Sequence, residues 1–142
     1  MALKGTLKIG DKVWNVQDCD YEFMKPYDNN FKPSAHCKGG LINFSILSDD
    51  KEDLFFHDWM FKTTDLQKGT FTFGLTKTND GGIPDPNKQK IVSFSNAYCV
   101  YLAEYYSNSN SSPMYMRITI SAAIIEFGTE TSFFNLGLAL EM

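Results

Sequence analysis

Two residue types that often perform chemistry stand side by side in the stretch KPYDNNFKPSAHCKGG, residues 25–40. His36 could serve as the base for the Cys37 thiol, which is the arrangement of a cysteine nucleophile. Adjacent residues of an extended chain point to opposite sides, however, and this hinders a direct hydrogen bond between the two side chains. The pair by itself is a nonspecific signal. A contact loop is therefore the simpler interpretation of this stretch.

A metal or phosphate site has as little support. The other histidine, His57, falls in a predicted helix, and joining it with His36 and a carboxylate around zinc would require a coincidence of the fold. The glycine pairs at 39–40 and 81–82 lack the spacing of a phosphate-binding loop. Four acids before His57 lack the ligand spacing of an EF-hand and are typical of a helix start; they are Asp49, Asp50, Glu52 and Asp53. We expect no catalytic residue, no metal and no cofactor.

The composition indicates a globular protein rich in aromatic side chains. Hydrophobic residues make up 43% of the 142 residues and aromatic residues 15%, which argues against disorder and leaves aromatics for an interface. The net charge is −4 without a basic run, so nucleic acid is not an expected partner. Cys19, Cys37 and Cys99 fit neither a disulfide framework nor a zinc ribbon. The length favours one domain, residues 1–142.

No segment of the sequence has the pattern of a signal peptide or a membrane span. The first ten residues, MALKGTLKIG, carry lysines and no apolar run. No later stretch approaches the ~18 uninterrupted apolar residues of a transmembrane helix. We expect synthesis in a reducing compartment, no membrane insertion, and a dedicated machine for any export.

Alternation of apolar and polar residues predicts a fold that is mainly β. Two strands form a hairpin around the turn Gly10-Asp11, and SNSNSSP joins two long strands into a second hairpin. A loop built from turn residues spans 78–89. The predicted strands are residues 3–9, 13–23, 41–47, 69–76, 91–106 and 114–127.

One amphipathic helix is expected among these strands, over about residues 50–62. Asp49 and Glu52 resemble a capping box at its start. Its apolar face consists of Phe55, Phe56, Trp59 and Met60. These side chains could line a ligand pocket, but helical spacing next to a sheet favours core packing. A single small antiparallel β-barrel of two packed sheets with one flanking α-helix accounts for this order of elements.

Four segments in order make a further comparison possible: LKIGDKVWNVQDCDYEF, KPSAHCKGGLINFSI, DDKEDLFFHDWM and ITISAAIIEFGTETSFFN. Together they resemble the haemolysin-coregulated protein family, the tube protein of bacterial type VI secretion, in its Bacteroidetes-type form. The resemblance covers most of the chain. One departure lies at Phe31, which begins the sequence Phe-Lys-Pro-Ser where similar chains tend to carry Gly-Arg-Pro-Ser.

The resemblance implies a structural protein and no enzymatic activity. It implies a small β-barrel that forms a homo-hexameric ring, and rings that stack into a tube. The expected partners are a spike protein, a contractile sheath, and effector proteins carried in the lumen. The protein would assemble in the bacterial cytoplasm and then be secreted without a signal peptide.

These assemblies need contact surfaces, for which the sequence offers candidates. Stacking needs a projecting element, and residues 24–38 are the best candidate, with Tyr27, Asp28, Phe31, Lys32 and His36 as contact residues. Ring closure needs two different complementary patches. We expect the edges of the barrel strands, the helix and the C-terminal tail to supply them.

A face of small side chains is expected on the two long strands, because the small residues alternate with apolar ones along each strand and therefore point to the opposite side. This face could line the lumen or meet a neighbouring subunit. Its residues are Ser93, Ser95 and Ala97 in the first strand and Thr119, Ser121 and Ala123 in the second.

Two other classes of protein stay open at this point. A monomeric β-barrel that binds a sugar or a lipid would use the aromatic side chains as a pocket. A cysteine-dependent enzyme would depend on Cys37. The oligomeric state separates the tube subunit from the first alternative, and a Cys37→Ala variant tests the second.

Overall fold

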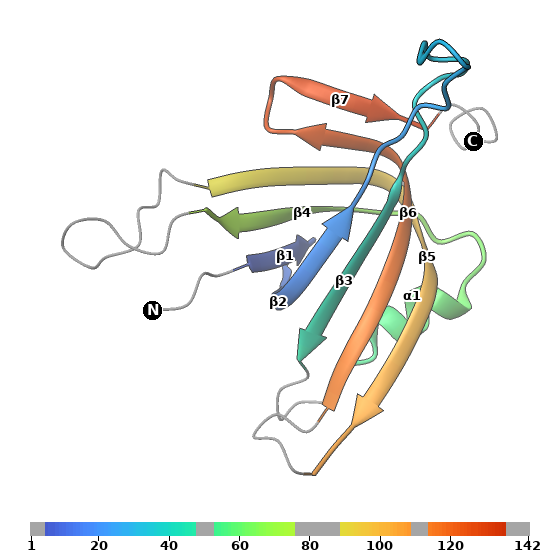
Figure 1. Cartoon of the computed structure of the whole chain (residues 1–142). Helices are drawn as coiled ribbons and strands as arrows, with labels where there is room; N and C mark the ends of the chain where they lie inside the picture. The colour runs from blue at the N-terminus through green and yellow to red at the C-terminus, as the bar shows by residue number, and fades with distance from the viewer. Residues whose placement is uncertain (1–4, 48–52, 76–88, 109–113, 136–142) are drawn as a thin grey trace.

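The computed structural model describes residues 5–47, 53–75, 89–108 and 114–135 (Figure 1). In these residues the elements follow one another as β1 (Gly5–Ile9), β2 (Lys12–Tyr21), β3 (Leu41–Leu47), α1 (Phe55–Phe61), β4 (Gln67–Gly74), β5 (Gln89–Tyr106), β6 (Met114–Phe127) and β7 (Thr131–Phe134). The predicted order of six strands and one helix is confirmed for β1 to β6 and α1, with ends that differ by a few residues, whereas the sequence did not predict β7. Residues 3–4 of the first predicted strand, and residues 78–88 of the predicted loop, lie outside the described part.

The strands close into an antiparallel barrel, as the sequence predicts. Neighbours in the sheet follow the order β3-β2-β1-β4-β5-β6, and β6 pairs again with β3, so that six strands form a closed ring. β7 pairs with β6 beyond the start of β3 and flanks the barrel. Closure in this way removes most strand edges from solvent.

A shared bend in β5 and β6 makes this closure possible. Asn96 in β5 adopts φ 53°, a left-handed conformation that interrupts the alternation of the strand. Phe94 pairs with Ile125 and Ala97 pairs with Ala122, and all four side chains are buried. Two residues of each strand lie between these inward pairs, where regular alternation has one. β5 therefore turns from β4 and continues beside β6 alone, as Figure 1 shows.

The bend overturns part of the predicted alternation. The sequence predicts Ala97 and Ala123 on an exposed outer face, but the two side chains are 0% and 1% exposed. Ala97 belongs to the barrel core. Beyond the bend Ile125 is buried in the core, while Ile124, expected on the inner row, is only half-buried. A left-handed asparagine inside a strand shifts the inward positions without any glycine or proline to mark the shift.

The inner faces of the strands supply a continuous apolar core. Phe44 on β3 and Phe71 on β4 meet at 5.2 Å between ring centroids, and Phe94 on β5 lies 5.7 Å from Phe71. Branched aliphatic side chains fill the space around these rings. The fully buried ones are Leu7, Ile42, Ile46, Val92, Ile118, Ile120 and Ile125.

The helix starts later than the sequence predicts. α1 begins at Phe55, since Asp53 and Leu54 are not helical, and residues 50–52 with the expected capping pair lie outside the described residues. Asp53 organises the start from outside the helix. One carboxylate oxygen accepts a hydrogen bond from the Phe55 amide at 3.0 Å, and the other accepts one from Trp14 Nε1 at 2.7 Å. The same side chain therefore anchors the helix start to β2.

The apolar face of α1 closes one side of the core. Phe56 and Trp59 are buried, and Phe55 and Met60 are half-buried against the core. Phe56 stands 5.9 Å from Phe44, between ring centroids. The polar end of the Trp59 ring is satisfied, because Nε1 donates to the backbone carbonyl of Asp65 at 3.0 Å. These four side chains, three aromatic residues and one Met, thus pack against the barrel core.

Gly40 allows us to test how tightly the chain is held where it enters β3. Its φ is +106°, and a Cβ at this position would lie 2.9 Å from the backbone oxygen of Ala122. We expect Gly40→Ala to reduce the free energy of unfolding by roughly 2–4 kcal/mol, from backbone strain plus overpacking. Urea denaturation of the dilute protein measures this loss.

Gly10→Ala is the matched control, since Gly10 also has a positive φ, +62°, but a Cβ there would meet nothing within 4 Å. We expect it to cost only the conformational part, about 1–2 kcal/mol. Equal losses for the two variants would contradict the close approach at Gly40.

Candidate assembly surfaces

A projecting hairpin joins β2 to β3 and stands clear of the barrel at the top of Figure 1. We call residues 24–38 the arm. At its base Met24 and Lys38 exchange two backbone hydrogen bonds, of 2.9 and 2.6 Å. Further out Tyr27 and Pro33 form an isolated bridge, and the Ser34 amide donates to the Pro26 carbonyl at 2.8 Å. The arm is therefore an ordered ladder and not a loose loop.

The tip of the arm is a tight turn organised by one aspartate. The Asp28 backbone carbonyl accepts from the Phe31 amide at 3.0 Å. The Asp28 side chain accepts from the amides of Asn30 and Lys32 at 2.9 and 3.0 Å. Phe31 takes φ 62°, the left-handed region that suits glycine, and a side chain there costs about 1–2 kcal/mol. This backbone geometry explains why a glycine is expected at Phe31.

The strained residue also exposes its side chain. Phe31 is 81% exposed and Tyr27 is 63% exposed. Their rings stack at 5.8 Å with 27° between the planes. The structure thus brings four predicted contact residues, Tyr27, Asp28, Phe31 and Lys32, together at the tip, while His36 lies exposed on the returning limb.

The two candidate chemical residues on the arm do not form a dyad. The Cys37 sulfur contacts the backbone carbonyl of Lys38 at 3.8 Å. The second histidine is also engaged elsewhere, since His57 Nε2 lies 2.5 Å from Glu104 Oε1 and so links α1 to β5. Among the described residues no group of three or more His, Cys, Asp and Glu side chains is arranged to hold a metal ion.

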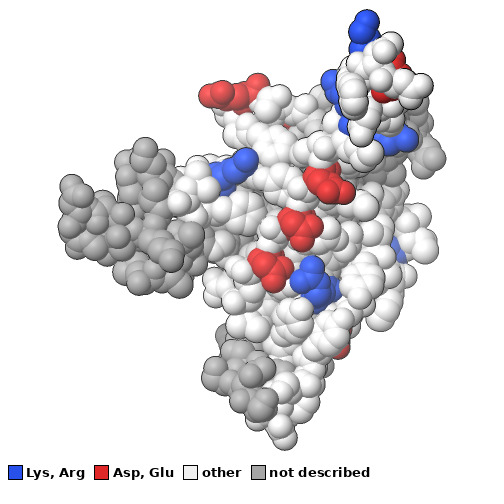
Figure 2. Space-filling model, in the orientation of Figure 1, with Lys and Arg blue, Asp and Glu red and all other residues white. Residues whose placement is uncertain are grey.

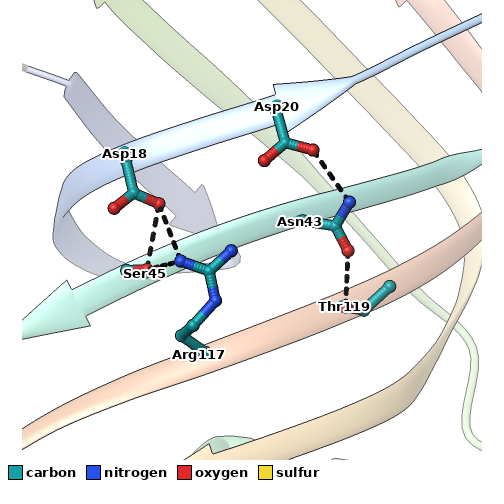
Figure 3. Close-up of polar contacts among 6 residues, drawn as sticks. All are labelled: Asp18, Asp20, Asn43, Ser45, Arg117 and Thr119. Carbon is teal, nitrogen blue, oxygen red and sulfur yellow. Dashed lines mark hydrogen bonds and ion pairs between the residues drawn. The ribbon is translucent and has the colours of Figure 1, made fainter.

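A second surface lies on the outer face of β2, β3 and β6, and Figure 3 shows its six side chains. We call it the polar sheet face. Pairing aligns its members in two rows across the three strands, because side chains of paired residues point to the same side. The first row is Asp18, Ser45 and Arg117, and the second is Asp20, Asn43 and Thr119.

Each row is linked by hydrogen bonds. Ser45 Oγ donates to Asp18 Oδ1 at 2.9 Å and accepts from Arg117 Nη1 at 3.0 Å, although Ser45 is fully buried. The Arg117 guanidinium lies 3.5 Å from the same Asp18 oxygen. A hydrogen bond that the guanidinium donates to Tyr115, together with the Asp18 carboxylate, raises the pKa of Arg117, so its side chain stays positively charged.

The second row carries its own chain of donors and acceptors. Thr119 Oγ1 donates to Asn43 Oδ1 at 2.6 Å, and Asn43 Nδ2 donates to Asp20 Oδ1 at 2.9 Å. Figure 2 shows a column of acidic side chains on this face with a basic one beside it. The polar groups on this face satisfy one another, so the surface is ordered and acidic along β2.

An aromatic row crosses the same sheet where β3 and β5 end and β6 begins. We call Leu47, Tyr105 and Tyr115 the aromatic row, since they are paired across β3, β6 and β5. The rings of Tyr105 and Tyr115 stack at 5.2 Å, and Tyr105 and Leu47 are 49% and 39% exposed. The sheet therefore presents apolar surface at the end far from the arm.

The predicted face of small residues does not exist as one surface. Thr119 and Ser121 lie on the outer side of β6 with Arg117. Ser93 and Ser95 lie beyond the bend, where Ser93 Oγ is 3.2 Å from Thr70 Oγ1. Ala97 and Ala123 are buried, as described above.

Sequence reasoning missed most of the polar sheet face. Asp18 and Asp20 alternate in β2, and Asn43 and Ser45 alternate in β3, so a period-2 signal was present in both segments. Which strands lie beside each other, and in which register, follows from barrel closure and cannot be read from either segment alone.

The sheet formed by β2, β3, β6 and β5 has two edges without a partner strand among the described residues. β1 pairs with β2 only up to Val16. Beyond it Gln17 lies at the bulge, and residues 18–21 of β2 pair with β3 alone. β4 pairs with β5 only up to Ala97, so residues 98–106 of β5 pair with β6 alone. A groove of about 540 Å³ runs beside residues 17–21, with Phe73 and Leu75 on its other wall.

Comparison with known proteins finds one matching family and solved structures that share the fold. Residues 1–135 match the family described as hemolysin coregulated protein Hcp (TssD). The fold is shared with Hcp1 from Flavobacterium johnsoniae, at a TM-score of 0.75 and 24% identity over 93% of this chain and 99% of that one. The fold is also shared with Hcp1 from E. coli EAEC 042, at a TM-score of 0.68 and 13% identity over 93% of this chain and 97% of that one. No curated protein matches the chain in sequence.

A cap protein has a more distant likeness. The tube-terminating cap of the anti-feeding prophage shares the fold at a TM-score of 0.50 and 14% identity, over 88% of this chain and 87% of that one.

Within the described residues, no helix has the length and apolar character that a membrane span requires.

The three thiols provide a direct test of whether cysteine chemistry is available. Burial, with the Asp20 and Asp18 carboxylates nearby, raises the pKa of Cys19 to about 12, and burial raises that of Cys99 to about 11. Both stay protonated at pH 8, and the thiolate is the reactive form. We expect Ellman's reagent to titrate one thiol, Cys37, in the folded protein and all three in urea. Rapid reaction of a second thiol in the folded state would contradict these environments.

Proposed function

Because the chain belongs to the haemolysin-coregulated protein family (Hcp, TssD), we propose that it is a structural tube subunit of a bacterial type VI secretion system. Six copies of the subunit close into a ring, and the rings stack into a tube. The observation that carries this proposal is a four-stranded sheet whose two edges differ from each other and have no partner strand among the described residues. The role is mechanical, and we assign no catalytic step to any residue.

The two open edges are suited to ring closure. A ring needs a head-to-tail contact between two different surfaces of the same subunit. Residues 17–21 of β2 form one edge of the sheet and residues 98–106 of β5 form the other, with β3 and β6 between them. A neighbour's β2 beside β5 would extend the sheet from subunit to subunit.

The strand directions agree with this arrangement. β2, β3, β6 and β5 are each antiparallel to the next strand, so β5 runs opposite to β2. A neighbour added in the same orientation would present its β2 antiparallel to this β5, and the alternation would continue around the ring. Backbone hydrogen bonds would supply the contact, as they do wherever a strand is added to a sheet edge.

The polar sheet face is the candidate lining of the lumen. Extending the sheet around a ring would set this face of every subunit on one side of the wall. Its side chains bond to one another through Ser45 and Asn43, which leaves few free donors to hold a passing protein. Small effector proteins are the proposed cargo, and the spike protein and the sheath are the proposed partners at the end and outside of the tube.

The arm is the candidate for stacking, since it stands clear of the barrel and is ordered by its own hydrogen bonds. A rigid projection costs less entropy to dock than a flexible loop. In this proposal the arm of each subunit contacts the next ring. The secretion machine then expels the tube from the cell.

Rings can be counted directly. We expect native mass spectrometry to find six copies of the chain and negative-stain electron microscopy to show rings with six-fold symmetry. A protein that stays monomeric at high concentration would contradict the proposal and would favour a monomeric binding module.

Shortening the arm separates stacking from ring closure. Tyr27 and Pro33 are bridge partners, so residues 28–32 can be replaced by Asn-Gly, the two-residue turn that hairpins prefer. We expect this variant to form rings and to lose tubes and secretion. Thermal unfolding is the control. A much lower melting temperature for the shortened variant than for the original chain would mean that the arm supports the fold and not the stack.

A further inference from the structure

We propose that the Tyr27–Phe31 pair is the aromatic anchor of the stack, and that it packs on the aromatic row, Leu47, Tyr105 and Tyr115, of a second copy of this chain. The inference rests on the proposed stacking role of the arm. It adds which residues carry the contact and which surface receives them.

Phe31 is held in a position from which the fold gains nothing. Its backbone has φ 62°, a conformation in which glycine would be free of strain, and 81% of its surface faces solvent. Its one described ring contact is with Tyr27, which is itself exposed. Strain of this kind persists where the surroundings impose it, and it is concentrated at ligand clamps and switch regions.

The Tyr27–Phe31 pair is already ordered for docking. The turn is fixed by three hydrogen bonds to Asp28, and the two rings stack at 5.8 Å. Exposed, rigid aromatic side chains are the usual hot spots of protein interfaces, because they bury a large area at a small cost in side-chain entropy.

Charge favours a second copy of the chain as the partner. The arm carries Lys25, Lys32 and Lys38 against Asp28, a net charge of +2, in a chain of net −4. The rest of the chain therefore carries −6, and the arm of one copy is attracted to the body of another. Figure 2 shows basic side chains gathered over the arm and acidic ones over the sheet.

The position of the aromatic row fits a head-to-tail stack. The arm leaves the upper end of β2 and β3, while Leu47 ends β3 at the lower end (Figure 1), and β6 alone separates it from the end of β5. A stack brings the upper end of one copy to the lower end of the next. The row offers two stacked tyrosine rings and a leucine, all wholly or partly accessible, which matches the chemistry of the tip.

Three substitutions at one position test the anchor. Phe31→Gly relieves the left-handed strain, Phe31→Ala keeps the strain without the ring, and Phe31→Tyr keeps both. We expect Gly and Ala variants to form rings but to raise the protein concentration needed for tubes by about thirtyfold or more, the range of an interface hot spot. The Tyr variant should stack like the original chain, and sedimentation with electron microscopy measures all three.

The receiving surface has its own test. In a Cys37→Ser background, Phe31→Cys combined with Tyr105→Cys should form disulfide-linked ladders of subunits under oxidation, whereas either cysteine alone should not. Tyr105→Ala should weaken stacking as Phe31→Gly does. Raising the salt concentration should weaken stacking, since the charge attraction is screened.

The outcomes are distinguishable from failure of the proposed function. No rings from the original chain would overturn the tube-subunit proposal itself. Rings and tubes from Phe31→Gly at the original concentration would overturn the aromatic anchor and leave the tube subunit standing. Normal stacking of Tyr105→Ala without cross-linked ladders would overturn the receiving surface.

Discussion

The bend that β5 and β6 share at Asn96 is the constraint on which the rest of the structure depends. One strand cannot pair with β4 and β6 along its whole length and still close a barrel this small, so it turns, and the left-handed asparagine makes the turn. Before the bend β5 is an interior strand of the barrel. After it, β5 is the edge of a four-stranded sheet, and the surfaces proposed for assembly all lie on that sheet or extend from it.

The bulge in β2 has the complementary effect at the opposite edge. The pairing of β2 with β3 shifts between Val16 and Asp18, so that Asp18 and Asp20 turn outward while Cys19 turns inward. The outward acids meet Ser45, Arg117 and the second row. Burial of Cys19 on the other side keeps its thiol protonated. A single irregularity therefore sets both the polar character of the face and the inertness of a cysteine.

The sequence predicted the elements of this fold better than its surfaces. Strand and helix positions follow from period-2 and helical spacing, and the core residues Phe56 and Trp59 follow from the same patterns. The buried position of Ala97 could not be predicted, because Asn96 breaks the alternation of β5 without a turn signal. The polar sheet face depends on β3 lying between β2 and β6, which is a property of the closed barrel.

The central claim is that subunits join edge to edge through β2 and β5 of one continuous sheet. A cryo-electron microscopy reconstruction of the assembled chain tests it most directly. The account predicts six-fold rings in which residues 17–21 of one subunit form an antiparallel ladder with residues 98–106 of the next. Rings whose subunits meet through other surfaces, with both of these edges facing solvent, would contradict it.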